Sequence, residues 1–94
     1  MKQAYRHETL AEMALRWYKL DDEKDLAHRL REIGANAWDG VTMVWELNRL
    51  ESRRAYLLSG NAPVRTLARH AEEIDWLETV HAAIARMVAE GVLA

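Results

Sequence analysis

The chain has 94 residues, with 13 Lys and Arg, 15 Asp and Glu, four His and no Cys. This length and near-balanced charge indicate one small domain, and the lack of Cys excludes disulfide and thiolate chemistry. Half of the residues are apolar and 15 are Ala, whereas only one Pro and four Gly are present, which excludes disordered and all-β chains. The sequence predicts a single all-α domain over residues 1–94, with residues 1–7 flexible. We expect a bundle of four helices, or of three with one long kinked helix, completed by oligomerisation.

No apolar run approaches the roughly 18–20 residues that cross a bilayer, and the N-terminal residues are polar. We therefore expect a cytoplasmic protein without membrane contact. Arg outnumbers Lys ten to three, a bias that GC-rich codon usage produces and that favours a bacterial or phage source.

The first predicted helix begins at Thr9. The Thr9 hydroxyl can accept from a first-turn N–H while Glu12 reaches back to the Thr9 N–H, which is a capping box. Apolar residues then recur at helical spacing to about residue 20, where we expect the helix to end; they are Leu10, Met13, Ala14, Trp17 and Leu20.

A second helix is predicted after the two aspartates at 21–22, either of which can cap it, and Gly34 is expected to end it. Asp39 is the candidate cap of a third helix. Apolar residues also keep helical register through Gly34 and Gly40, so one kinked helix from about 22 to 58 is the alternative. We favour the break because each interior Gly costs about 1 kcal/mol relative to Ala.

Residues 41–58 are apolar on two opposite sides when they are placed at about 100° per residue. One side holds Val41, Val44, Trp45, Ala55 and Tyr56, and the other holds Met43, Leu47, Leu50, Leu57 and Leu58. A surface helix of a monomer needs one apolar side only. This helix is therefore predicted to lie in the centre of the bundle or to be shared with a second chain, which favours a homodimer or a larger homo-oligomer.

The last helix is predicted from about Pro63 to Glu90, after a loop at 59–63 and with Gly91 as its stop. It carries a heptad seam formed by Leu67, His70, Ile74, Leu77, His81, Ile84 and Val88. Unpaired buried imidazole nitrogens are costly, so we expect each seam histidine to have a hydrogen-bond partner.

A second apolar strip on the last helix lies about 100° from the seam and consists of Trp76, Val80, Ala83 and Met87. With the apolar residues of 41–58, this is more apolar surface than a small monomer exposes, and aromatic and Met side chains are enriched at interface centres. The residues predicted to contact a partner are Trp45, Tyr56, Trp76, Val80 and Met87.

Arginines gather between residues 49 and 69, where Glu51 is the only acid; they are Arg49, Arg53, Arg54, Arg65 and Arg69. Guanidinium clusters bind phosphates and carboxylates. This cluster is the predicted anionic contact, with a nucleic acid or a phosphate ligand as the alternative partner. The net charge of −2 argues against a dedicated duplex-DNA binder.

Glu78 and His81 stand at i and i+3, a spacing that places two metal ligands on one side of a helix. A metal ion shared across a dimer axis would make the chain a metal- or His-dependent enzyme, which is the third hypothesis.

The main interpretation assigns no cofactor, no metal and no catalytic residue. The chain has no Cys nucleophile and no Gly-rich phosphate-binding loop. The sequence favours a non-enzymatic interaction module, a small regulatory, adaptor or inhibitor protein that binds another protein.

Overall fold

The computed structural model describes residues 9–18 and 26–94, which form four helices and no strand. The helices are α1 (Leu10–Trp17), α2 (Leu26–Glu32), α3 (Ala37–Ser59) and α4 (Val64–Ala89). The predicted all-α fold is confirmed. The expectations for residues 1–7, for the caps at 21–22 and for Leu20 lie outside the described residues. None of the four described helices combines the length and the apolar character that crossing a membrane requires.

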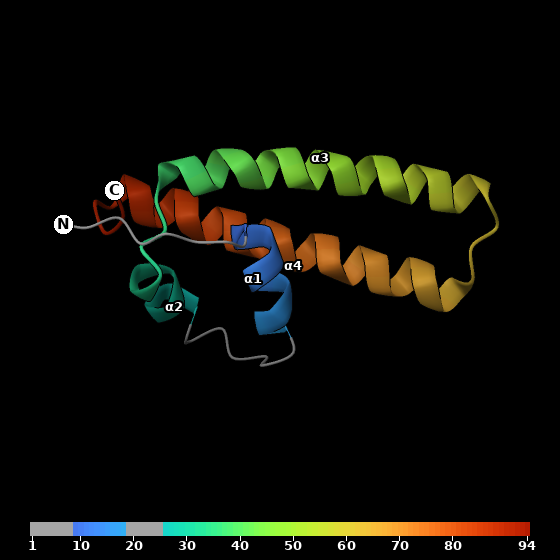
Figure 1. The fold of residues 1–94 in the computed structure, drawn as a ribbon, viewed down its shortest axis with the longest axis horizontal. Coiled ribbons are helices and arrows are strands. Elements are labelled where there is room, and N and C mark those ends of the chain that lie inside the picture. Colours follow the sequence, from blue (N-terminus) through green and yellow to red (C-terminus); the bar gives the residue numbers. More distant parts are fainter. Residues whose placement is uncertain (1–8, 19–25) are drawn as a thin grey trace.

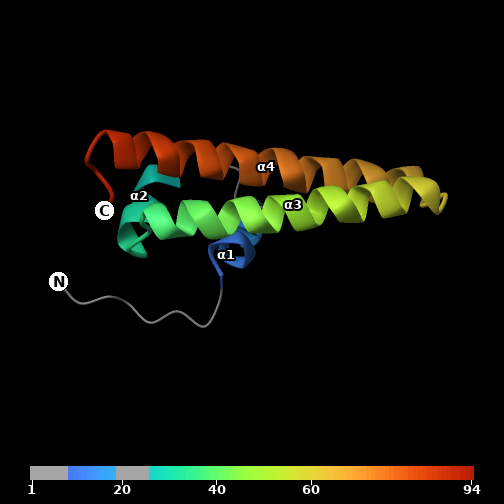
Figure 2. The ribbon, with the colours of Figure 1, turned by 90° about the horizontal axis from the view of Figure 1, so that it is seen from above.

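The two long helices, α3 and α4, form an antiparallel hairpin, and α1 and α2 pack against it (Figure 1). α1 lies beside the middle of the hairpin, and α2 lies near the end where α3 starts and α4 finishes. The turn between α3 and α4 is at the opposite end, beyond both short helices (Figure 2). We call residues 55–68 the hairpin tip.

Polar side chains determine where α1 and α3 begin. At α1 the predicted capping box is present, because Glu12 N–H donates to Thr9 Oγ1 at 3.2 Å and Thr9 N–H donates to the Glu12 carboxylate at 3.3 Å. The cap of α3 is Asn36, which accepts from two first-turn N–H groups. The expected cap at Asp39 is corrected: its carboxylate accepts from Asn36 N–H at 2.9 Å, as the third residue of the same capping box. The break before α3 is confirmed, and the alternative of one helix over 22–58 is wrong.

Three helices end at a residue with positive φ. Gly34 follows α2 at 71°, Asn61 follows α3 at 60°, and Gly91 follows α4 at 77°. This left-handed conformation lets the next N–H group return to a carbonyl of the last turn, as Val92 N–H does to the Met87 oxygen at 2.8 Å. The predicted stops at Gly34 and Gly91 are confirmed.

The core lies along α4, which contacts the three other helices. The largest side chains that are fully buried come from all four helices and are Leu10, Leu30, Met43, Leu77, Val80 and Ile84. α1 and α2 have only eight and seven residues, and helices this short are unstable alone in water. Their apolar sides are therefore held by the surface of the hairpin.

The second strip of α4 faces α1 and α2. Val80 and Met87 are 0% and 4% exposed, so both belong to the core of one chain. Trp76 is partly buried, and its Nε1–H donates to the Ala14 carbonyl oxygen of α1 at 2.6 Å. The prediction that Trp76, Val80 and Met87 contact a partner is corrected, because the chain covers this strip with its own short helices.

Replacing Asn36 with Ala removes the side-chain acceptor at the start of α3. Two first-turn N–H groups then lose their partner, and we expect the free energy of unfolding to fall by about 1 kcal/mol. Urea denaturation followed by circular dichroism measures the change. Asn36→Ser, which keeps an acceptor, should lose less than half as much. Equal losses for the two variants would show that the cap does not stabilise α3.

Candidate interaction surfaces

Large apolar side chains are exposed along α3 and at the start of α4. Those exposed by 39% or more on these helices are Trp38, Val41, Val44, Trp45, Tyr56, Leu58 and Val64. The predicted contact residues Trp45 and Tyr56 are thus at the surface, at 58% and 67% exposure. The opposite side of the same helix is inside the protein, where Met43 is buried and Leu47 and Leu50 pack against the core. The two-sided apolar pattern of residues 41–58 therefore leaves one side available to a partner.

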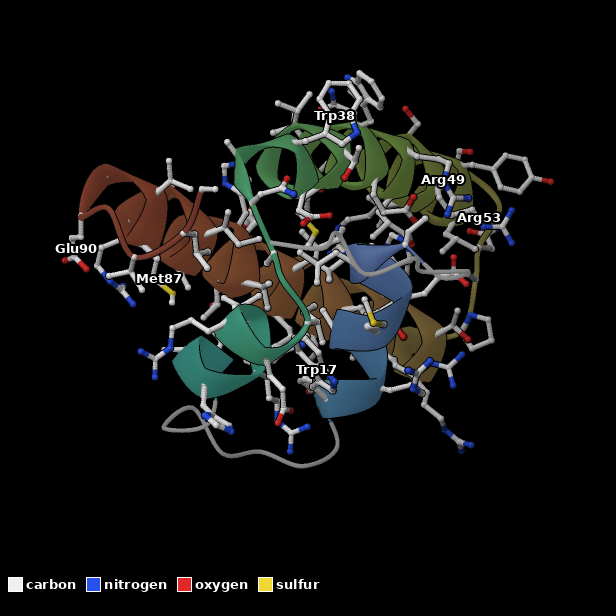
Figure 3. All side chains as sticks on the ribbon, turned by 60° about the vertical axis from the view of Figure 1, so that its left-hand side comes forward. Trp17, Trp38, Arg49, Arg53, Met87 and Glu90 are labelled. Atoms are coloured by element: carbon white, nitrogen blue, oxygen red, sulfur yellow. The ribbon has the colours of Figure 1, made fainter. Side chains whose placement is uncertain are left out.

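Three of these aromatic residues form a row with two arginines on the side of α3 that points away from the core. We call it the outer stripe, and it consists of Trp38, Trp45, Arg49, Arg53 and Tyr56, at successive spacings of seven, four, four and three residues. Figure 3 shows Trp38 on the side of α3 that faces away from Trp17 and Met87.

Side chains of the outer stripe contact one another and a neighbouring acid. The rings of Trp38 and Trp45 meet edge to face, with centroids 5.5 Å apart and planes at 90°. The Arg53 guanidinium lies over the Tyr56 ring, 5.5 Å from its centroid. Arg49 forms an ion pair with Glu46 one turn earlier, and hydrogen bonding to that carboxylate, with its negative charge, raises the pKa of Arg49.

The five arginines of the predicted anionic contact lie on adjacent stretches of α3 and α4, but they do not form one surface. Arg49 and Arg53 belong to the outer stripe. Arg54 points across to α4, where its Nη1 donates to the Leu67 carbonyl oxygen at 3.1 Å. Arg65 and Arg69 are exposed on α4. The guanidinium groups therefore spread around the hairpin near its tip instead of converging on one anion.

A groove runs between α3 and α4. Its first part is an apolar hollow of about 250 Å³, lined by Ala37, Gly40, Val41, Val44, His81, Ile84, Ala85 and Val88. We call it the apolar groove. The next part, toward the hairpin tip, is polar and is lined by Glu51, Arg54, Ala71, Ile74, Asp75 and Glu78.

The two seam histidines differ in their surroundings. His70 is 8% exposed, and neither of its ring nitrogens has a hydrogen-bond partner. The expectation that each seam histidine is paired is therefore wrong for His70. His81 is partly buried and lines the apolar groove.

The weak metal candidates Glu78 and His81 line different parts of the groove between α3 and α4. Glu78 lies beside Glu51 and Asp75 in the polar part, whereas His81 lies among Val and Ala side chains. Over residues 9–18 and 26–94, no three His, Asp or Glu side chains come together as a metal site.

Three exposed residues of these surfaces were not predicted from the sequence to lie there, namely Trp38, Leu58 and Val64. Trp38 precedes Trp45 by seven residues, so the heptad spacing could have placed both on one side of α3. The sequence placed Leu58 on the same side of the helix as Met43, which is buried, but Leu58 is 54% exposed.

No protein-family model matches the sequence, and no curated protein or solved structure matches it.

The unpaired state of His70 leads to a stability prediction. Leu at this position removes two buried polar atoms without partners, each of which carries a desolvation penalty. We expect His70→Leu to raise the free energy of unfolding by about 1 kcal/mol, measured by urea denaturation. His28→Leu is the control, because the His28 side chain is 67% exposed, and it should change the value by less than about 0.5 kcal/mol. A lower stability of His70→Leu would show that the imidazole makes a stabilising interaction.

Proposed function

We propose that this protein is a non-enzymatic interaction module that binds another protein through the outer stripe of α3. The observation that carries the proposal is the exposed pair of tryptophans, Trp38 at 61% and Trp45 at 58%, held edge to face on the surface. Trp, Tyr and Arg are the residues most enriched among those that dominate binding energy at protein interfaces. The outer stripe consists of these three residue types alone.

The contacts between side chains of the outer stripe support the proposal. Aromatic side chains that already contact a neighbour lose little conformational freedom on binding, which lowers the entropic cost of association. The Arg53–Tyr56 and Trp38–Trp45 contacts meet this condition. α3 also spans 23 residues, or about 35 Å, so the stripe offers an extended helix surface to a groove or to another helix.

The test compares wild-type protein with the double variant Trp38→Ala/Trp45→Ala. Affinity purification from the organism that makes the protein, followed by quantitative mass spectrometry, identifies a partner protein that is then expressed and purified. We expect the double variant to bind this partner at least 100-fold more weakly, since each tryptophan at an interface centre contributes 2 kcal/mol or more. Its free energy of unfolding should change by less than about 1.5 kcal/mol, because both side chains are largely exposed.

Leu58→Ala/Val64→Ala is the matched control, because these side chains are also exposed by more than half but lie outside the outer stripe. It should bind the partner like wild type. Equal loss of affinity in both double variants would contradict a site on the outer stripe. Recovery of nucleic acid in place of protein, with log affinity falling linearly with log salt, would instead favour the phosphate-binding alternative through the arginines.

A further inference from the structure

The side of the hairpin that α1 and α2 do not touch carries the groove between α3 and α4. On α4, Trp76 and Ala83 face the short helices, whereas Glu78 and Ala85 line the groove. Two residues along a helix correspond to a rotation of about 200°, so these pairs point in nearly opposite directions. We call this side the groove face, and no other helix of the described residues packs against it.

The groove face has a hollow near one end and a projection near the other. The hollow is the apolar groove, which is lined partly by the small residues Ala37, Gly40 and Ala85. At the other end, Leu58 and Val64 are 54% and 82% exposed, and we call this exposed apolar pair the projection. Glu51 and Arg54 line the polar part of the groove. Leu58 follows them by seven and four positions, so it lies on the same side of α3 as they do.

The same periodicity places Val64 on the groove face, because it precedes Ala71 and Glu78 by seven and fourteen residues. The groove face thus bears an apolar projection and an apolar hollow that do not touch one another within the chain. Their separation follows from the pairing of the helices.

Gly40 marks the register, because a Cβ atom added there would lie 3.6 Å from Ile84 Cγ2. In an antiparallel pair, position 40+n of α3 lies level with position 84−n of α4. Val64 is then level with position 60 of α3. At a rise of 1.5 Å per residue, the projection lies about 28 Å from the centre of the hollow.

This arrangement is self-complementary under a two-fold rotation. Suppose that a second chain is related to the first by a 180° rotation about an axis that crosses the helices at the level of Leu50, halfway between projection and hollow. Each projection then meets the other chain's hollow. The contact is then made twice, as isologous dimers require. A partner of a different kind would fill one hollow and leave the projection exposed.

Charges between the two apolar ends follow the same symmetry only in part, because Arg54 meets an acid whereas Glu51 of each chain comes level with Asp75 of the other. Arg54 lies four residues, about 6 Å, from the axis level toward the hairpin tip. Glu78 is level with position 46, and so lies about 6 Å from the axis level in the opposite direction. The two-fold rotation therefore places Arg54 of each chain level with Glu78 of the other. Within one chain, both residues line the polar part of the groove.

The groove face is close in size to one side of a standard dimer interface. It is about 35 Å long and two helices of about 10 Å wide, which corresponds to roughly 700 Å². A standard interface buries about 800 Å² on each partner. We infer that the groove face binds a second copy of this chain in antiparallel orientation, with Leu58 and Val64 of each copy in the apolar groove of the other.

The first test is the mass in solution. Light scattering at about 50 µM should give twice the 10.9 kDa of one chain, and Val64→Glu should reduce the mass to that of one chain with an unchanged helical circular dichroism spectrum. Tyr56→Glu is the matched control, because Tyr56 is also exposed near the hairpin tip but belongs to the outer stripe; it should remain a dimer. A single-chain mass for the wild-type protein would overturn the inference.

The second test is the charge pairing. Glu78→Arg should weaken the dimer at least tenfold by placing two Arg side chains together, and Arg54→Glu/Glu78→Arg in the same chain should restore it. Failure of the double variant to recover, while its helical signal is intact, would contradict the antiparallel register.

Cross-linking checks the orientation directly, because the chain contains no native Cys. Val64→Cys and Ala85→Cys are both exposed positions, and the proposed symmetry brings each beside the other across the interface. A short bismaleimide should link a mixture of the two variants into dimers that contain one chain of each. Dimers from Val64→Cys alone would demonstrate a tip-to-tip arrangement and overturn the antiparallel one.

This inference does not depend on the proposed function, because the outer stripe and the groove face are different sides of α3. Val64→Glu is expected to lose self-association and to keep the affinity for the partner protein. Trp38→Ala/Trp45→Ala is expected to do the reverse. Failure of one proposal is thereby distinguished from failure of the other.

Discussion

The pairing of α3 with α4 is the interaction on which the other parts of this molecule depend. A helix of seven or eight residues cannot persist in water by its own hydrogen bonds, so α1 and α2 exist because the hairpin offers them an apolar surface. The indole of Trp76 illustrates how this works, because its N–H donates across to the Ala14 carbonyl oxygen of α1. Near it, the Tyr18 hydroxyl donates to Glu72 at 2.6 Å, which adds a polar link from the end of α1 to α4.

Asymmetric covering of the hairpin explains why the protein has surfaces left for association. Two short helices cover one side over part of its length, and large apolar side chains on the other sides remain exposed. The outer stripe and the groove face differ in chemistry. The first presents aromatic rings and guanidinium groups, which we propose bind another protein, whereas the second presents a hollow and exposed apolar side chains, which we propose bind a second copy of the chain.

Local signals made much of the fold predictable. The capping box at Thr9, the stops at Gly34 and Gly91 and the extent of the last helix each rest on a few neighbouring residues, and the structure confirms them. Asn36 was missed although Asn with an acid three residues later is a start signal. Asp39 was recognised as polar and close to the helix start, but one carboxylate can serve as the cap or as its partner.

The surfaces were harder to predict because periodicity shows that a helix side is apolar without showing what covers it. Trp45 and Trp76 stand in similar strips, yet one is exposed and the other packs on α1. Which of the two tryptophans is covered depends on where α1 packs, and this is determined by the whole chain. The burial of His70 follows from its seam position, whereas its lack of a partner depends on which side chains lie opposite, and no short-range pattern contains that information.

The position of the hairpin tip beyond α1 and α2 has a consequence for how the molecule opens. Within one chain, backbone amides near Leu77 are protected by a core to which all four helices contribute, whereas those on either side of Asn61 are protected by a two-helix contact alone. Opening free energies are lowest where buried apolar contacts are fewest. In a single chain we therefore expect fraying to begin at the tip and to move inward, so that amide hydrogens exchange with solvent in a gradient along the hairpin, fastest beside the turn and slowest where α1 crosses it.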